Sequence, residues 1–235
     1  MFRKAIPFTF ILIPGVFGCA GSVPGARPQD MSEQQHATAA AEHEREGMQH
    51  ASRYDPEAAT GVARDCAQYL GSCWGTNPTE EHKDQAEEHR RAAAAHRAAS
   101  QALRDAEARA CLGVSERDRD VSPFLHREAI ANVKPLTRTV QAGRGLVEQP
   151  AGATVVLLPA AGVTAERLQR IVECHIARNA SLGNDVPEMA YCPLVPKGVT
   201  ATVTSAGNAF AVKIASEDRA TAEEILRRAR LLSPR

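Results

Sequence analysis

The sequence predicts an α+β protein: a long helical hairpin rich in alanine and histidine, followed by a small β-α-β-β-α domain. Two stretches rich in Ala, Glu and His, 33–53 and 79–112, contain no proline and favour helix. Six of the eight histidines recur on them at a spacing of seven residues, which keeps them on one helix face. From residue 153 on, β-branched runs alternate with amphipathic stretches, a pattern typical of a domain that combines sheet and helix.

Signals for ending and starting helices delimit the hairpin, which we assign to residues 36–112. Pro56 and then Gly61 interrupt the first helix. Asn77 or Thr79 can cap the second, and Gly113 ends it. The connection between the two helices contains cysteines and is expected to be centred near Cys66.

The C-terminal region, residues 151–235, predicts the small domain. "ATVVLLP" is typical of a buried strand, and Thr164 is placed to cap the amphipathic helix that follows. "VTATVTS" and "AFAVKIA" predict a β-hairpin, and Asp218 can cap a last helix. This order resembles a ferredoxin-type fold that lacks its last strand, a likeness of fold that implies no activity.

Residues 113–150 lie between the two parts and predict a short helix and a linker. Pro123 suits the first position of a helix over "SPFLHREAI". Gly143, Gly145, Pro150 and Gly152 interrupt residues 134–152, which we therefore expect to be a linker.

The N-terminus has the pattern of an export signal. "MFRKAIPFTFILIPGVFGCAGS" has a basic start, an apolar run too short for a membrane-spanning helix of about 20 residues, and Gly18 before Cys19. It resembles the lipobox of bacterial lipoproteins. The resemblance implies that residues 1–18 are a signal peptide, that Cys19 is lipidated, and, with Ala20 next, that the protein lies on the periplasmic side of the outer membrane. Residues 19–35 are then expected to be a disordered tether.

The remaining five cysteines would lie in an oxidising compartment, where disulfides are the rule. We favour pairing of Cys73 with Cys111 and of Cys174 with Cys192, which leaves Cys66 unpaired. A local Cys66–Cys73 bridge within the connection stays open as an alternative. The chain contains no CxxC pair, so a cysteine zinc site is disfavoured.

The histidines form two ladders: His36, His43 and His50 on the first helix, and His82, His89 and His96 on the second. Seven residues advance a helix by about 10.5 Å, so no single ion can bind two histidines of one ladder. In an antiparallel hairpin, the residue numbers of two facing positions add up to the same value at every layer. This rule predicts three layers: His36 with His96, His43 with His89, and His50 with His82. Each layer offers two ligands, short of four unless Glu42, Glu46 or Glu88 assists.

Four interpretations of the ladders remain open. The histidines can occupy one of the two core positions along the contact of an Ala-rich helix pair, with Ala at the other core position. They can be a solvated face, or a site for Zn²⁺ or another divalent transition metal. Stacked histidines would also repel one another once protonated, below about pH 6.5, which would make the hairpin respond to pH.

We therefore expect a non-enzymatic, lipid-anchored envelope protein with a structural or partner-binding role. Its partners would be the membrane, through the anchor, and an envelope protein. Formal net charge is zero, so no nucleic acid is expected. No catalytic or phosphate-binding motif occurs, and no cofactor is expected beyond the metal. The alternative is a periplasmic metal-binding or metal- and pH-sensing protein that resembles helical-hairpin metal sensors in organisation. The rest of the chain is similar to bacterial lipoproteins of unassigned activity, on motifs such as "CHIARN" and "YCPLVP".

The anchor is testable by metabolic labelling with a palmitate analogue. The parent chain should incorporate label and the Cys19→Ser variant should not, because the cysteine sulfur is the proposed acceptor. Equal labelling of the two chains would exclude the anchor.

Overall fold

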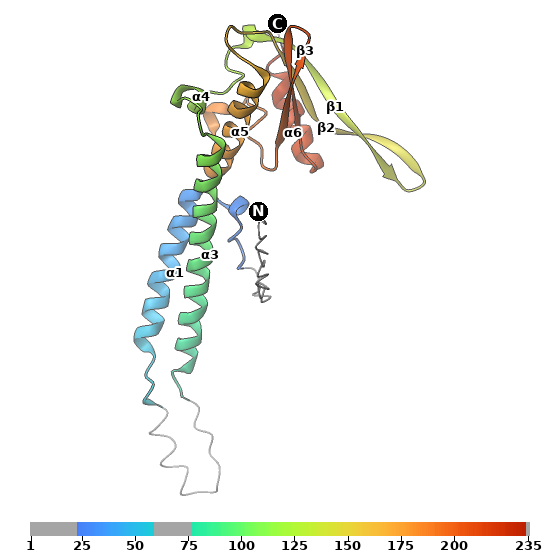
Figure 1. The fold of residues 1–235 in the computed structure, drawn as a ribbon. Coiled ribbons are helices and arrows are strands. Elements are labelled where there is room, and N and C mark those ends of the chain that lie inside the picture. Colours follow the sequence, from blue (N-terminus) through green and yellow to red (C-terminus); the bar gives the residue numbers. More distant parts are fainter. Residues whose placement is uncertain (1–22, 59–76, 234–235) are drawn as a thin grey trace, which may run out of the picture.

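A computed structural model describes residues 23–58 and 77–233, and it confirms the predicted fold class. A long helical hairpin extends from a small domain that contains a four-stranded sheet (Figure 1). The hairpin helices are α1 (Glu33–Arg53) and α3 (Glu80–Ala110). The predicted connection near Cys66, and Cys19, lie outside the described residues.

Helix α1 has the predicted bounds, and its start is fixed by a reciprocal cap. The Gln35 backbone N–H donates to Ser32 Oγ at 3.1 Å, and the Ser32 backbone N–H donates to Gln35 Oε1 at 2.8 Å. At the opposite end of the hairpin, the Asp55 backbone N–H donates to Thr79 Oγ1 at 3.0 Å. Asn77 Nδ2 donates to the Asp55 carbonyl at 2.7 Å, so the end of α1 is tied to the start of α3.

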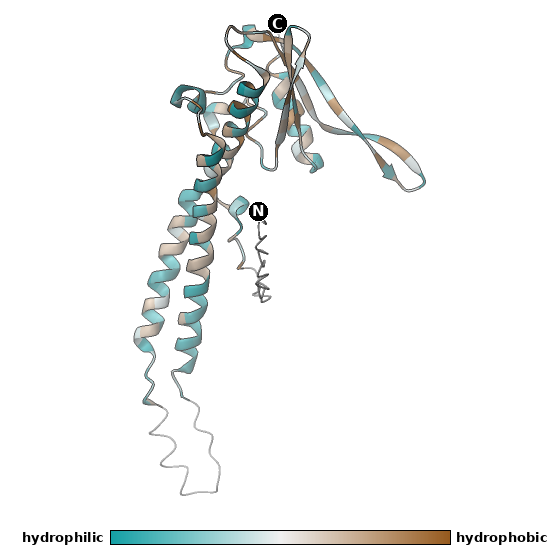
Figure 2. Ribbon diagram, in the orientation of Figure 1, coloured by the Kyte–Doolittle hydropathy of each residue, from teal (hydrophilic) through white to brown (hydrophobic). Residues whose placement is uncertain are grey.

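Small side chains line the hairpin between the histidine layers. Ala40 and Gly47 of α1, and Ala86 and Ala93 of α3, are buried. A Cβ atom added at Gly47 would lie 3.4 Å from the Ala86 carbonyl oxygen and 3.4 Å from His89 Cβ, so the helices approach closely there. Hydrophilic residues cover most of the outside of both helices (Figure 2). The predicted seam of His and small residues is confirmed.

The C-terminal domain has a four-stranded antiparallel sheet in the order β1-β2-β4-β3. Its strands are β1 (Ile130–Ala142), β2 (Gly145–Leu157), β3 (Thr200–Ala206) and β4 (Ala209–Ala215). Helices α5 (Ala165–Ser181) and α6 (Arg219–Arg230) share one apolar core with the sheet. The predicted caps are confirmed: Thr164 accepts from the Arg167 N–H and Asp218 from the Thr221 N–H.

Buried side chains alternate along the central strands, so one face of the sheet is covered by the two helices. Val155 of β2 and Val212 of β4 are fully buried, whereas Lys213 next in sequence is exposed. The largest side chains of this core are Phe124, Leu194, Ile214, Ile225 and Leu232.

Residues 134–152 are not a linker, contrary to prediction; they lie within the long β1-β2 hairpin. The residues that suggested a linker have other roles. Gly143, at φ 61°, lies in the tight turn. Pro150 lies on β2 opposite Thr137 of β1, in the part of β2 that is not paired with β4, so a missing N–H is tolerated there. A Cβ atom at Gly152 would lie 2.0 Å from the Ile214 carbonyl oxygen, so glycine permits the close approach of β2 and β4.

Strand β1 also explains why the ferredoxin-type pattern lacked a last strand. In the three strands β2-β4-β3, the outer edge of β2 is the place where a strand following α6 would pair. Strand β1, which comes before β2 in the chain, already occupies that edge. The short helix before it differs from prediction as well. It is α4 (Glu116–Asp120), capped by Ser115, while Pro123 lies in a turn before a 3₁₀-helix (Arg127–Ala129).

The described part of the expected tether is packed against the protein. A 3₁₀-helix spans Pro28–Asp30, and Asp30 lies 3.9 Å from Lys197 Nζ. Ser32 sits against Gly183, where an added Cβ atom would be 3.0 Å from Ser32 Cβ. Residues 23–35 are therefore not the disordered tether that their composition predicted.

One disulfide joins the hairpin to the domain, and its pairing differs from both predicted bridges. Cys111, at the end of α3, is bonded to Cys174 of α5, with Cα atoms 4.5 Å apart. The reason is that α3 extends beyond α1 and packs on α5, where Arg178 and Glu107 also form an ion pair at 3.0 Å. Cys192 is a buried free thiol, so the predicted Cys174–Cys192 and Cys73–Cys111 bridges are wrong.

Within the described residues, no helix has both the length and the apolar character needed to cross a bilayer.

Removing the bridge by Cys111→Ser with Cys174→Ser should lower the free energy of unfolding by about 2–4 kcal/mol, because it closes a long loop. The two cysteines are 63 residues apart. Urea unfolding followed by circular dichroism measures the difference. Cys66→Ser, which leaves this bridge intact, is the control. Superimposable curves for the double variant and the parent would contradict the expectation.

Candidate metal centre

The six ladder histidines meet in three layers across the hairpin, in the predicted register. Nδ1–Nδ1 distances are 3.0 Å for His36–His96, 3.1 Å for His43–His89 and 3.1 Å for His50–His82. The layers arise because both helices repeat histidine every seven residues and run antiparallel. The register prediction is confirmed.

An Nδ1–Nδ1 contact at this distance requires the two rings to share one proton. A neutral imidazole has one N–H and one lone pair, so one ring must donate from Nδ1 while its partner accepts there. The accepting ring then carries its own proton on Nε2. A second proton between the rings would set two N–H groups against each other and turn one of the two rings into a cation.

Ring stacking links the layers to one another. His43 stacks on His96 with ring centroids 5.7 Å apart and an interplanar angle of 19°. His50 stacks on His89 at 5.5 Å and 13°. Pairing within layers and stacking between them join all six rings into one continuous column, which we call the imidazole column.

The inner layer of the imidazole column is more buried than the other two layers. His36 is 0% exposed and His96 3%, whereas the His43 and His89 side chains are 31% and 25% exposed. Burial, followed by the proximity of His36 and His43, lowers the pKa of His96. His36 Nε2 is buried and has no hydrogen-bond partner among residues 23–58 and 77–233. The inner layer is thus shielded from solvent, while the middle layer is partly exposed to it.

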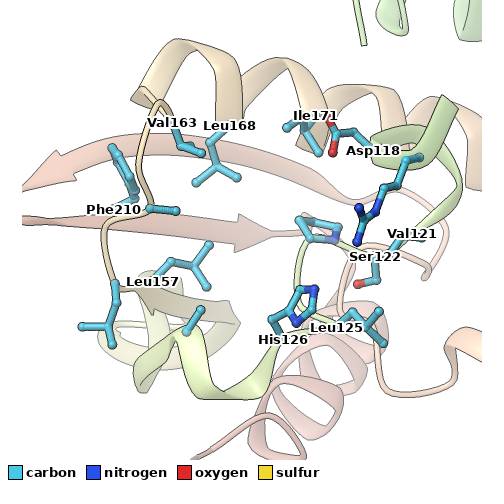
Figure 3. A pocket seen from close by; sticks show the side chains of 15 residues that line it. Asp118, Val121, Ser122, Leu125, His126, Leu157, Val163, Leu168, Ile171 and Phe210 are labelled. Carbon is cyan, nitrogen blue, oxygen red and sulfur yellow. The ribbon is translucent and has the colours of Figure 1, made fainter. Parts of the chain in front are cut away.

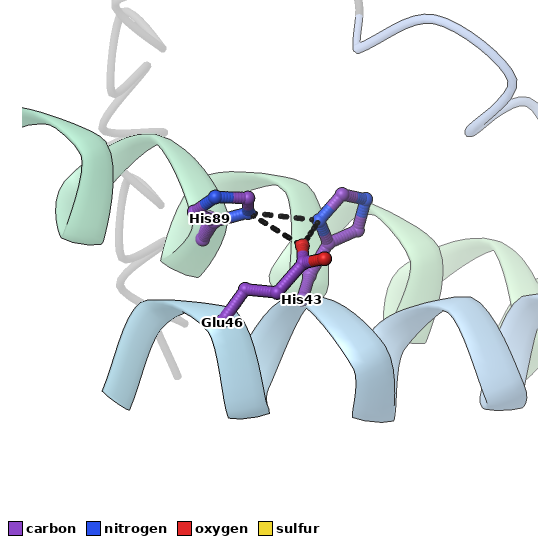
Figure 4. Close-up of side chains that lie close together, drawn as sticks. All are labelled: His43, Glu46 and His89. Atoms are coloured by element: carbon purple, nitrogen blue, oxygen red, sulfur yellow. Dashed lines mark hydrogen bonds and ion pairs between the residues drawn. The ribbon is translucent and has the colours of Figure 1, made fainter. Parts of the chain in front are cut away.

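The middle layer has a third donor, Glu46, which lies beside both rings (Figure 4). Glu46 Oε2 is 3.5 Å from His43 Nδ1 and 3.2 Å from His89 Nδ1, and the two nitrogens are 3.1 Å apart. In a tetrahedral zinc site, with bonds of about 2.0–2.1 Å, neighbouring ligand atoms are roughly 3.3 Å apart. The three donor atoms therefore have the spacing of one face of such a tetrahedron.

Two imidazoles and one carboxylate are a set of ligands that zinc accepts with a fourth position open. The Glu46 side chain is 52% exposed, so water or another group can approach the open position. Within residues 23–58 and 77–233, His43, Glu46 and His89 form the one group of three His, Cys, Asp or Glu side chains whose ligand atoms lie close enough together to hold a metal ion.

Among the described residues, the outer and inner layers have no comparable third ligand. The residue three positions after His36 is Ala39, and the one after His50 is Arg53. Glu33, near the inner layer, accepts hydrogen bonds from Ser100 at 3.1 Å and Arg104 at 2.5 Å, so its carboxylate is occupied.

Sequence reasoning named Glu42, Glu46 and Glu88 as assisting carboxylates without choosing among them. The structure brings Glu46 to the site and leaves Glu42 and Glu88 exposed outside the group. A signal was available: Glu46 is the one carboxylate placed three residues after a ladder histidine, and residues three apart share a helix face.

The sequence also juxtaposes Cys174 and His175, a pairing that can serve nucleophilic chemistry. The Cys174 sulfur is held in the disulfide. His175 Nε2 lies 2.5 Å from the Val121 carbonyl oxygen, and burial lowers the pKa of His175. These two residues therefore fasten α5 to its neighbours.

Comparisons with protein-family models, curated proteins and solved structures gave no significant match. The assignment of function therefore depends on the geometry of the imidazole column and of Glu46.

The hairpin should lose stability as the pH falls from about 7.5 to about 5.5. The pKa of His96 in the folded protein lies below its unfolded value of about 6.5. Between those two pKa values the unfolded chain binds more protons than the folded chain. The contribution of neutral His96 to the free energy of unfolding is therefore complete above about pH 6.5. Below that pH it declines by up to about 1.4 kcal/mol per pH unit for each proton that the folded protein does not bind. Urea unfolding followed by helical circular dichroism at both pH values measures it.

Replacing the inner pair, by His36→Leu with His96→Leu, should reduce that pH dependence. His126→Gln, which alters an exposed histidine outside the hairpin, should leave it unchanged. An undiminished pH dependence in the double Leu variant would show that the inner pair is not its source.

Proposed function

We propose that this chain is an exported, lipid-anchored envelope protein whose hairpin binds one divalent transition metal ion at His43, Glu46 and His89. The observation that carries the metal proposal is the spacing of the three donor atoms, 3.1, 3.2 and 3.5 Å, close to that of ligands on one zinc ion. The anchor would be Cys19, and the hairpin would then lie on the periplasmic side of the outer membrane.

The ligand types favour a borderline cation over calcium or magnesium. Imidazole nitrogen suits Zn²⁺, Cu²⁺ and Ni²⁺, whereas Ca²⁺ and Mg²⁺ prefer all-oxygen sites. Both imidazoles must offer the Nδ1 lone pair, so the shared proton of this layer has to move to Nε2 when the ion binds. Protonation of the imidazoles competes with the metal, so occupancy is expected to fall as the pH is lowered.

Binding would couple to the packing of the hairpin, because the ligands come from both helices. His43 and Glu46 lie on α1 and His89 lies on α3. An ion held by the three stabilises the paired helices relative to separated ones. We propose that the hairpin thereby senses metal and pH, with an envelope protein as the partner that responds.

A structural role for the same hairpin is the second candidate. Ala40, Gly47, Ala86 and Ala93 pack the seam and offer no metal ligand. On this reading the histidines serve as a paired seam, and the function of the chain is to bind a partner without catalysis. Metal titration separates the two candidates.

Titration of the full chain with Zn²⁺ in a calorimeter should give one site per chain. His43→Ala and His89→Ala should each weaken binding by at least about tenfold, since each removes one of three metal bonds. Glu46→Gln should also weaken it, because a neutral amide is a poorer ligand than a carboxylate. Co²⁺ bound in place of Zn²⁺ should show the visible absorption of tetrahedral coordination.

His82→Ala and Glu42→Gln are matched controls that remove the same groups from outside the site. Both should leave the affinity within about a factor of two of the parent. If His82→Ala weakened binding as much as His89→Ala, the metal would not be held by the middle layer. If the parent bound no metal, the structural role would be the better account.

A further inference from the structure

The C-terminal domain contains a cavity of about 460 Å³, and none of the histidines of the imidazole column lines it. It lies between the segment that begins with α4 and the adjacent parts of α5, β2 and β4. A cavity of this size falls within the range of about 300–1,000 Å³ that is usual for small-molecule sites.

Two sides of the cavity differ in chemistry (Figure 3). Asp118, Ser122 and His126 lie toward one side, and they come from α4 and the segment after it. The other side is apolar and comes from β2, β4, α5 and the loop before it; its residues are Leu157, Val163, Leu168 and Phe210.

The apolar surface continues to the rim of the cavity. Leu125 is 49% exposed and Leu158 is 47% exposed, and both belong to the lining. Large apolar side chains left half in water at the mouth of an apolar cavity would be further desolvated by an apolar ligand.

Among the charged side chains that line the cavity, Arg117 is the one available to an anion. Asp118 is paired with Arg167 at 3.0 Å, so its negative charge is offset. Arg117 is exposed and lines the cavity, and none of the described carboxylates lies within ion-pair distance of its guanidinium. His126 holds Glu128 through Nδ1 at 3.0 Å, and Glu128, which is not in the lining, is 78% exposed to solvent.

We propose that this cavity binds a small anionic amphiphile, a monocarboxylate with an unbranched medium-length alkyl tail. The tail lies along Leu157, Leu168 and Phe210. The carboxylate accepts hydrogen bonds from the Arg117 guanidinium, whose planar fork suits it. This binding activity is independent of the metal proposal, because no residue is shared between the two sites.

Calorimetry of the full chain carrying Cys19→Ser with decanoate, below its micelle concentration, tests the proposal. Decanoate should bind saturably at one site, at least about tenfold more tightly than decanol, which keeps the tail and lacks the charge. Butyrate, which keeps the charge and lacks most of the tail, should bind at least about tenfold more weakly than decanoate.

Matched variants locate the site. Arg117→Glu should abolish the preference for decanoate over decanol, while Arg144→Gln, which removes an exposed cation from the β1-β2 turn, should not. Leu125→Asp should weaken binding of both ligands at least tenfold, while Leu146→Asp, at a residue of β2 that is 74% exposed, should not. Circular dichroism confirms that each variant is folded.

Absence of saturable decanoate binding by the folded parent would overturn the proposal. So would equal binding by the parent and the folded Arg117→Glu and Leu125→Asp variants, since the ligand would then occupy another apolar surface, such as the N-terminal segment.

Discussion

The contact between Nδ1 atoms of facing histidines is the constraint on which the hairpin depends. Each contact requires one ring to donate and the other to accept, and three such contacts at 3.0–3.1 Å occur at intervals of seven residues. A shift of one residue in the register would break all three at once. Small residues at the alternate seam positions allow the approach, and Gly47 opposite Ala86 shows how little room is left.

The same periodicity explains why the register was predictable. Seven residues return a helix to the same face, and two ladders of equal length can align in one antiparallel register that pairs every histidine. The helix bounds and the caps at Thr164 and Asp218 were equally readable, because they depend on residues close together in the chain. The choice of Glu46 over Glu42 and Glu88, which have the same chemistry, was also readable, because Glu46 alone follows a ladder histidine by three residues.

What the sequence did not predict depends on contacts between distant segments. Glycine and proline in residues 134–152 are compatible with a linker or with an edge hairpin, and the deciding contact, Gly152 against Ile214, comes from another strand. Cysteine spacing did not show that the end of α3 reaches α5, so the Cys111–Cys174 bridge was missed. Composition suggested a free tether where Ser32 packs against Gly183.

The placement of the disulfide has a mechanical consequence. It fastens one end of α3, a helix of 31 residues and so about 46 Å long, to the domain. Helix α3 is then attached to the domain at Cys111, and the middle histidine layer lies partway along its length. A small rotation of α3 about Cys111 would displace Glu80, at the other end of the helix, by many ångströms. How much of a movement at the domain reaches Glu80 depends on how rigid the paired helices are.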